Sequence, residues 1–178
     1  MDEHRNLVFS EEDIKLYSRL DIACRDLLDA MSFGAFILKK GWKAKPWSRG
    51  STYLQQSAFV TSMVVSYGRA FSNSNGWGYL SKAMRASFDP DEASLHDRLM
   101  TDRNQLYAHS DSIHYPLTPW ASSYHSDVMH FQERAVFPGD ILKLQDMCRK
   151  VIAACRAEQA RIKAKYQCRR FRRPYEAW

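Results

Sequence analysis

Apolar residues between Ser10 and Gly41 recur every three or four positions, and this spacing constrains the fold more than any other feature of the chain. The recurring residues are Tyr17, Leu20, Cys24, Leu27, Leu28 and Met31. Steps of three and four place side chains on one face of an α-helix. Ser10 with Asp13 three residues later suits a helix start, and Gly41 after Lys39 and Lys40 suits a stop. The segment therefore predicts one long amphipathic helix.

A second helix is expected over about 52–72, where residues are apolar or small nearly all the way round. Such a helix is either central in a bundle or shared between the core and a contact with a second copy of the chain. A turn and a short helix within 79–87 follow. Trp42 and Trp47 lie in the loop before the second helix, and we expect them to fold back on the bundle, with a contact surface as the alternative.

Two further helices are predicted. One opens at Asp89 and Pro90, reaches about His109, and buries Leu95, Leu99 and Leu106. The other begins with Asp140 as its cap and continues to about Lys165. Its apolar stripe contains Ile141, Leu144, Cys148, Val151, Ile152 and Cys155.

A long insert separates these two helices. Prolines at 116, 119 and 138 exclude a single long helix over 110–138, and residues 126–137 alternate enough to form a hairpin arm. The sequence therefore predicts an all-α fold. We expect an antiparallel four- or five-helix bundle over 1–165, with a long loop or hairpin insert between the last two main helices, and a tail at 166–178.

The bulk properties describe one globular domain of 178 residues. No apolar run approaches the roughly 18 residues that a membrane span needs, and the first residues are polar, so we expect a cytoplasmic protein without membrane attachment. None of the four cysteines forms a CxxC pair, and Cys148 and Cys155 lie seven positions apart on one helical stripe. Buried thiols are therefore favoured over a metal site or a disulfide, and no metal or cofactor is expected.

The positive charge is concentrated at one end of the chain. Residues 143–178 hold eleven of the 26 basic residues and three of the 20 acidic ones, whereas the rest is slightly acidic. A basic end suits a polyanion such as RNA, with a solubilising helix face and a floppy tail as the alternative. The residues expected to grip RNA by charge and stacking are Arg169, Arg170, Phe171, Arg172 and Arg173.

The most informative segment is Asp102–Asp111, with the sequence DRNQLYAHSD. Its Arg103, Asn104 and His109 resemble the motif of HEPN domains, in which an Arg is followed by a polar residue and, a few positions later, by a His. The context is similar too, because the motif ends the third main predicted helix. One departure is Asp111, which stands where one toxin–antitoxin branch of that family has a modifiable Tyr, so the chain looks closer to the abortive-infection branch.

The resemblance implies a homodimeric helical bundle with metal-independent endoribonuclease activity, in which the Arg and His of two subunits converge on one cleft. Carried over, the catalytic residues are Arg103, Asn104 and His109. A toxin or antiphage defence role is expected, with an antitoxin or a defence-system protein as a partner. The alternatives are a non-catalytic RNA- or nucleotide-binding module of this fold and a helical adaptor or dimerisation protein.

The residue types suit this chemistry. Without a metal, RNA cleavage uses the ribose 2′-OH as nucleophile, and His109 can move the proton near neutral pH. Arg103 can hold the phosphate with a permanent charge, and Asn104 can orient the phosphate or the imidazole. Arg103 and His109 do not share one helix face, because six helical residues turn about 600°. An Arg and a His near a helix end can also be only a dipole pair.

The insert offers a weaker alternative site. His114, His125, His130 and Asp127 all lie within it. Their irregular spacing favours exposed or packed histidines over a metal site.

Overall fold

The computed structural model describes residues 9–43, 50–73, 76, 78–104, 117–124, 126–130 and 138–167 of the chain. It contains the helices α1 (Glu11–Lys40), α2 (Thr52–Phe71), α3 (Pro90–Asp102) and α4 (Pro138–Gln167), the short 3-10 helix η1 (Lys82–Arg85), and the strands β1 (Leu117–Ala121) and β2 (Ser126–His130). The strands form an antiparallel hairpin with Leu117 opposite His130. The predicted helical fold, with a hairpin between the last two helices, is confirmed.

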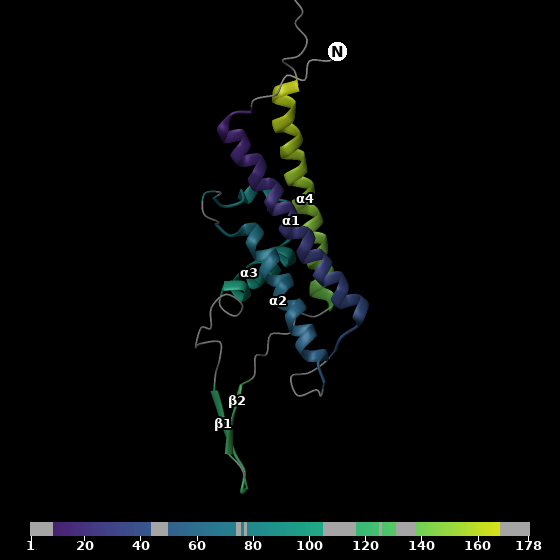
Figure 1. Cartoon of the computed structure of the whole chain (residues 1–178), viewed down its shortest axis with the longest axis vertical. Coiled ribbons are helices and arrows are strands. Elements are labelled where there is room, and N and C mark those ends of the chain that lie inside the picture. Colours follow the sequence, from purple (N-terminus) through teal and green to yellow (C-terminus); the bar gives the residue numbers. More distant parts are fainter. Residues whose placement is uncertain are drawn as a thin grey trace, which may run out of the picture.

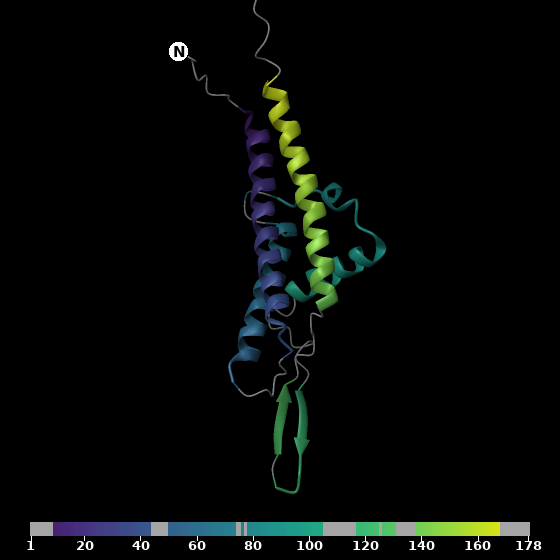
Figure 2. The same cartoon turned by 90° about the vertical axis from the view of Figure 1, so that its right-hand side faces the viewer.

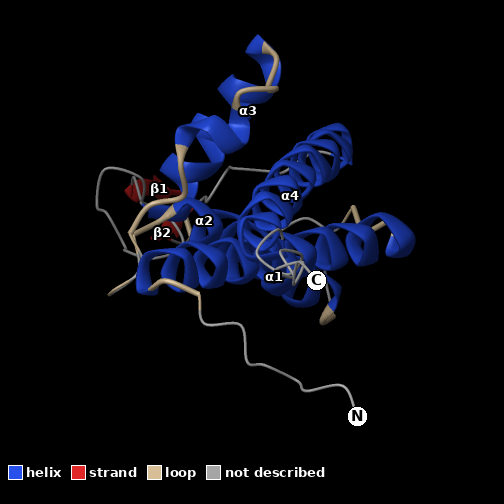
Figure 3. Cartoon of the chain, turned by 90° about the horizontal axis from the view of Figure 1, so that it is seen from above, coloured by secondary structure: helices blue, strands red, loops and turns tan. Residues whose placement is uncertain are grey.

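The helices form an antiparallel bundle. α1 runs down the molecule, whereas α2 and α4 run up it, and the hairpin extends away from the helices (Figure 1, Figure 2). α1 packs on α2 and α4, and α3 packs on the same two helices. Seen from above, α1 and α3 lie on opposite sides of the pair (Figure 3). Among the described helices, α3 is therefore attached to the bundle mainly through α2 and α4.

The ends of α1 follow from its sequence. The Ser10 side chain accepts a hydrogen bond from the Asp13 amide, and Gly41 closes the helix at a φ of 58°. Left-handed backbone of this kind strains residues with a Cβ, which is why glycine suits the stop. One member of the predicted stripe is wrong, because Leu28 is 43% exposed while its neighbour Leu27 is fully buried. Successive helical residues differ by about 100°, so the core admits only one of the two.

Two predicted boundaries shift. Asp140 is not the cap of the last helix, because α4 already begins at Pro138 and Asp140 lies in its first turn. Proline is favoured at a helix start, since its missing N–H has no partner to lose there. At the other end α4 continues to Gln167, beyond the predicted 165. The hydroxyl of Tyr166 donates to Asp13 Oδ2 at 2.7 Å and accepts from the Ser10 amide at 2.9 Å. This residue therefore belongs to the bundle and not to the tail.

The core lies among all four helices. Its largest fully buried side chains are Leu20, Leu27, Met63, Val64, Tyr67, Leu99, Ile141, Leu144, Met147, Cys148, Val151 and Ile162. Gly34 marks the point where α1 meets both neighbours, because a Cβ there would lie 2.8 Å from Ile141 Cγ2 and 3.2 Å from Met63 Sδ. The glycine thus permits close approach of three helices.

Arg19 holds the end of α2 from inside the bundle. It is 3% exposed, and its guanidinium donates to the carbonyls of Ala70, Ser72 and Gly78 at 2.7, 3.2 and 3.0 Å. The last carbonyls of a helix have no partner within the helix and carry partial negative charge, so a cation is well placed there. Nothing in the apolar spacing of this helix predicts that the arginine is internal.

The loop after α1 returns to the bundle in part. The Trp42 ring lies 5.7 Å from that of Phe36 and 5.6 Å from that of Phe59, as expected. Trp47 lies outside the described residues. The predicted short helix at 79–87 is reduced to η1. None of the described helices is both long enough and apolar enough to cross a membrane.

Candidate functional site

The helix that ends at the candidate site, α3, has a well-defined start. The Asp89 side chain accepts from the Glu92 amide at 2.8 Å, and the Glu92 carboxylate accepts from the Asp89 amide at 2.9 Å. This capping box satisfies two donors that the helix itself leaves unpaired. A helix of 13 residues is still marginal alone, so its position depends on contacts with α2 and α4.

Three ion pairs attach α3 to α4, and the longest of them joins Lys143 to Asp91 at 3.2 Å. Lys150 Nζ lies 2.7 Å from both carboxylate oxygens of Glu92, and Arg98 lies 2.7 Å from Asp140. The Glu92 side chain is 6% exposed, whereas that of Lys150 is 38% exposed. Removing Lys150 would therefore leave a poorly solvated carboxylate. These pairs therefore determine where α3 crosses α4.

A buried hydrogen bond attaches α3 to α2. The Tyr67 hydroxyl and His96 Nδ1 are 2.9 Å apart, and both side chains are buried. Burial lowers the pKa of His96 to about 4, helped by the positive charge of Arg85, and it raises the pKa of Tyr67. His96 is therefore neutral at neutral pH, and its ring packs on those of Tyr67, Phe71 and Phe88.

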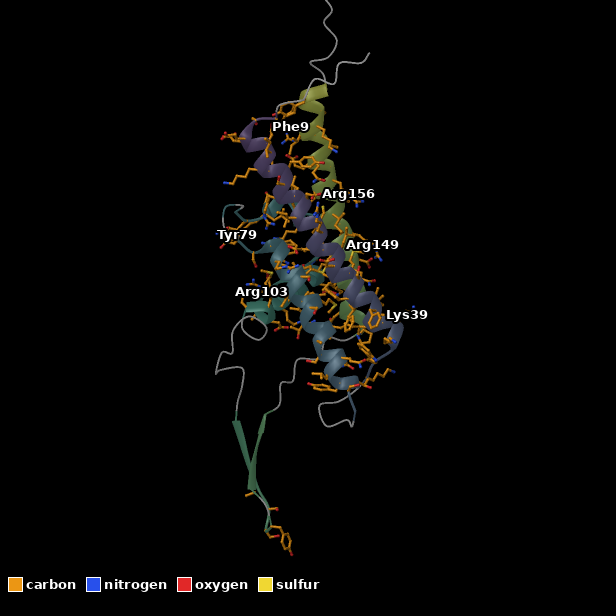
Figure 4. The ribbon with its side chains drawn as sticks, viewed as in Figure 1. Phe9, Lys39, Tyr79, Arg103, Arg149 and Arg156 are labelled. Carbon is orange, nitrogen blue, oxygen red and sulfur yellow. The ribbon has the colours of Figure 1, made fainter. Side chains whose placement is uncertain are left out.

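Arg103 follows α3 and lies against α2. Its backbone keeps helical angles, with φ −56° and ψ −46°. A Cβ built at Gly68 would lie 2.6 Å from Arg103 Cγ, 3.1 Å from its Cβ and 3.2 Å from its Cδ. The aliphatic part of Arg103 thus rests directly on the α2 backbone. Figure 4 shows this residue at the α3 end, beside α2.

The Arg103 guanidinium is only partly satisfied. Its Nη1 donates to Asn104 Oδ1 at 2.8 Å, whereas its Nε is buried and has no hydrogen-bond partner. Among the described residues no carboxylate pairs with it. A buried donor without an acceptor costs about 1–3 kcal/mol. The guanidinium can donate hydrogen bonds to a ligand oxygen without first breaking an ion pair. The arrangement suits an anion such as a phosphate.

The predicted catalytic residues are placed in part. Arg103 and Asn104 directly follow α3, and Arg103 Nη1 donates to Asn104 Oδ1. His109 lies outside the described residues, as does the predicted part of this helix beyond 104. The tail residues Arg169, Arg170, Phe171, Arg172 and Arg173 also lie outside them.

The basic character of α4 is largely neutralised by pairing. Of its cations, Lys143, Arg149, Lys150, Arg161 and Lys165 each pair with a carboxylate. Lys163 lies 5.3 Å over the Tyr17 ring. Figure 4 shows Arg149 and Arg156 on the side of the bundle away from Arg103. The helix therefore offers less free positive charge than the sequence suggests.

The cysteines behave as core residues. Cys24, Cys148 and Cys155 are buried free thiols, as predicted, and burial raises the pKa of Cys148 to about 12. In the part of the chain that is described, no group of three or more His, Cys, Asp or Glu side chains could hold a metal ion. Cys168, His114 and His125 lie outside that part, and the side chain of His130 is not described.

Comparison of the chain with protein-family models, with curated proteins and with solved structures found no match. The fold and the site themselves describe a helical bundle in which an arginine follows the end of one helix. Sequence reasoning missed the residues that place this end, which are Gly68, Tyr67, Glu92 and His96. Two signals were present: a glycine in the middle of a predicted helix, and polar residues at the helical spacing of Leu95 and Leu99.

The state of His96 predicts a pH dependence of stability. An unfolded histidine has a pKa near 6.5, so between about pH 6.5 and 4 the unfolded chain binds the proton that folded His96 refuses. The contribution of neutral, buried His96 to the free energy of unfolding is therefore fully present above pH 6.5 and is lost as the pH falls toward 4. Between pH 7 and 4.5 we expect His96 to account for roughly 2–3 kcal/mol of lost unfolding free energy. Urea unfolding of wild type and His96→Gln at both pH values measures this, and equal losses in the two proteins would contradict it.

Proposed function

We propose that this chain is a metal-independent endoribonuclease of the HEPN type. Arg103 would hold the scissile phosphate, His109 would transfer the proton, and Asn104 would orient the phosphate or the imidazole. The observation that carries the proposal is the state of Arg103: a guanidinium whose stem lies on α2 and which has no carboxylate partner among the described residues. The type of reaction is inferred from the resemblance of Arg103, Asn104 and His109 to the HEPN motif.

The chemistry follows from these residues. The ribose 2′-oxygen attacks the adjacent phosphorus while His109 accepts its proton, and a P–O5′ bond then breaks as the leaving oxygen gains a proton. The products are a 2′,3′-cyclic phosphate and a 5′-hydroxyl. Negative charge grows on the phosphorane oxygens, and the two parallel N–H donors of a guanidinium match such a group.

A homodimer is part of the proposal. In HEPN domains the Arg and the His of two subunits converge on one cleft, so by the resemblance a second copy would complete each site. Light scattering of the purified protein at micromolar concentration should give twice the mass of 20.7 kDa. A strict monomer would leave each Arg103 without a partner subunit and would contradict this part.

The biological setting proposed is that of a toxin or an antiphage defence effector, with an antitoxin or defence-system protein as partner. An RNase released from such control harms its host. Expression of the wild type alone should therefore slow growth of the host cell, and the His109→Ala variant should not.

Substitution of the proposed catalytic residues tests the activity itself. With EDTA present, wild type should cut structured RNA. His109→Ala should lower the rate by about 100- to 10,000-fold, because general acid–base catalysis is lost. Arg103→Lys keeps the methylenes that lie on Gly68 but replaces the planar fork by an ammonium, so it should be poorly active too. The measurement is gel analysis of labelled RNA.

The matched control is Arg149→Lys, an exposed position on α4 that pairs with Asp146. This variant should cut as wild type does. Equal rates for wild type and His109→Ala would exclude the site. If wild type cuts no RNA but still binds it, the non-catalytic binding module becomes the better account.

The proposal assigns RNA affinity to the basic tail. Because most α4 cations are paired, Arg169, Arg170, Arg172 and Arg173 would supply the phosphate contacts, with Phe171 stacking on a base. Removal of 168–178, which leaves the Tyr166 contacts intact, should weaken binding and reduce its dependence on salt, since fewer counterions are released. Fluorescence anisotropy at several salt concentrations measures both quantities, and an unchanged salt slope would exclude the tail from the interface.

A further inference from the structure

Gly68 is the α2 residue that faces Arg103. The Arg103 side chain fills the space that a side chain at position 68 would need. Three successive carbons of the arginine, Cβ, Cγ and Cδ, lie 2.6–3.2 Å from where a Cβ of residue 68 would be. Real Cβ atoms essentially never approach another heavy atom more closely than 3.0 Å. Any side chain at position 68 would therefore have to displace the arginine, or α3 itself.

The backbone conformation does not require this glycine. Gly68 lies inside α2, whereas the described glycines with positive φ are Gly41, Gly50, Gly76 and Gly78. A glycine in a helix interior costs about 0.5–1 kcal/mol relative to alanine. The contact with Arg103 gives a physical reason for tolerating that cost.

The neighbouring contacts leave the arginine little choice of position. Tyr67, beside Gly68 in α2, is bonded to His96 two turns before Arg103 in α3. The Glu92–Lys150 pair holds the start of the same helix on α4. With α3 fixed in this way, the side chain of Arg103 must cross α2 where α2 has no side chain.

We infer that Gly68 is a positioning residue for Arg103: the bare α2 backbone seats the aliphatic stem and so fixes the guanidinium with its Nε inward and its Nη1 on Asn104. The inference rests on the proposed function only in naming the guanidinium as the phosphate contact. The contact of the Arg103 stem with the α2 backbone at Gly68, called the seat below, can be tested without RNA.

The first test uses stability in the full chain. Gly68→Ala should lower the melting temperature, because its methyl group displaces the Arg103 stem. In an Arg103→Ala background Cγ and Cδ are gone, so the same substitution should lower the melting temperature by less than half as much. Equal decreases in melting temperature in the two backgrounds would overturn the inference, because substitutions at sites that do not interact have additive effects. If Gly68→Ala alone does not fold, folding of the double variant supports the seat, and its failure to fold overturns it.

The second test observes the guanidinium directly. In protein labelled with ¹⁵N-arginine, the Arg103 Nε–H signal is identified by its loss in Arg103→Lys. Burial should make its proton exchange slowly with water, and Gly68→Ala should speed that exchange about tenfold or more. The control is Gly34→Ala, a buried helical glycine whose methyl would press on Ile141 and Met63. It should lower stability but leave the Arg103 signal unchanged.

Cleavage separates this inference from the proposed function. If wild type cuts RNA, Gly68→Ala should reduce kcat about 10- to 100-fold per folded molecule, since small misplacements of a catalytic group cost that much, while Gly34→Ala should not. A different outcome is that wild type fails to cut RNA while Gly68→Ala still speeds the Arg103 Nε–H exchange and its effect on the melting temperature still depends on Arg103. In that case the proposed reaction is wrong, and the positioning role of Gly68 is supported. An unchanged Arg103 signal in Gly68→Ala overturns the seat whatever the RNase result.

Discussion

The attachment of α3 to α2 and α4 is the constraint on which the candidate site depends. This helix is too short to be stable alone. It reaches the bundle through a partly buried ion pair at one end and a buried tyrosine–histidine hydrogen bond in its middle. Both contacts are specific in direction, unlike apolar packing, so they fix the rotation of the helix as well as its distance. The position of Arg103 is a consequence of that rotation.

Charge compensation distinguishes Arg103 from Arg19 and Arg98. Arg19 is also internal, but its donors meet helix-end carbonyls, and Arg98 meets Asp140. Arg103 donates from Nη1 to a neutral amide and has no carboxylate partner among the described residues. A structural arginine is expected to be satisfied, because leaving it unpaired opposes folding. An arginine that binds a phosphate must instead keep donors available until the phosphate arrives.

The fold could be predicted from the sequence because its local signals agree. Ser10, Gly41 and the Asp89-Pro90 start each mark a helix end that the structure contains. The interior polar contacts could not be predicted in this way. Glu92 and His96 occupy the buried stripe of α3, but their partners Lys150 and Tyr67 lie 58 and 29 residues away. In the sequence, Gly68 is only an unfavourable residue within a predicted helix, and its role becomes evident when Arg103 is seen to pack on it. Sequence spacing describes one helix at a time, whereas these residues act between helices.

The most direct measurement of the central claim compares one oligoribonucleotide with its 2′-O-methyl counterpart, both incubated with the full chain in EDTA. If the ribose hydroxyl is the nucleophile and Arg103 holds the phosphate, only the unmodified RNA is cut, and mass spectrometry finds 2′,3′-cyclic phosphate ends. Cleavage of both substrates, or products that end in a 5′-phosphate, would contradict the account.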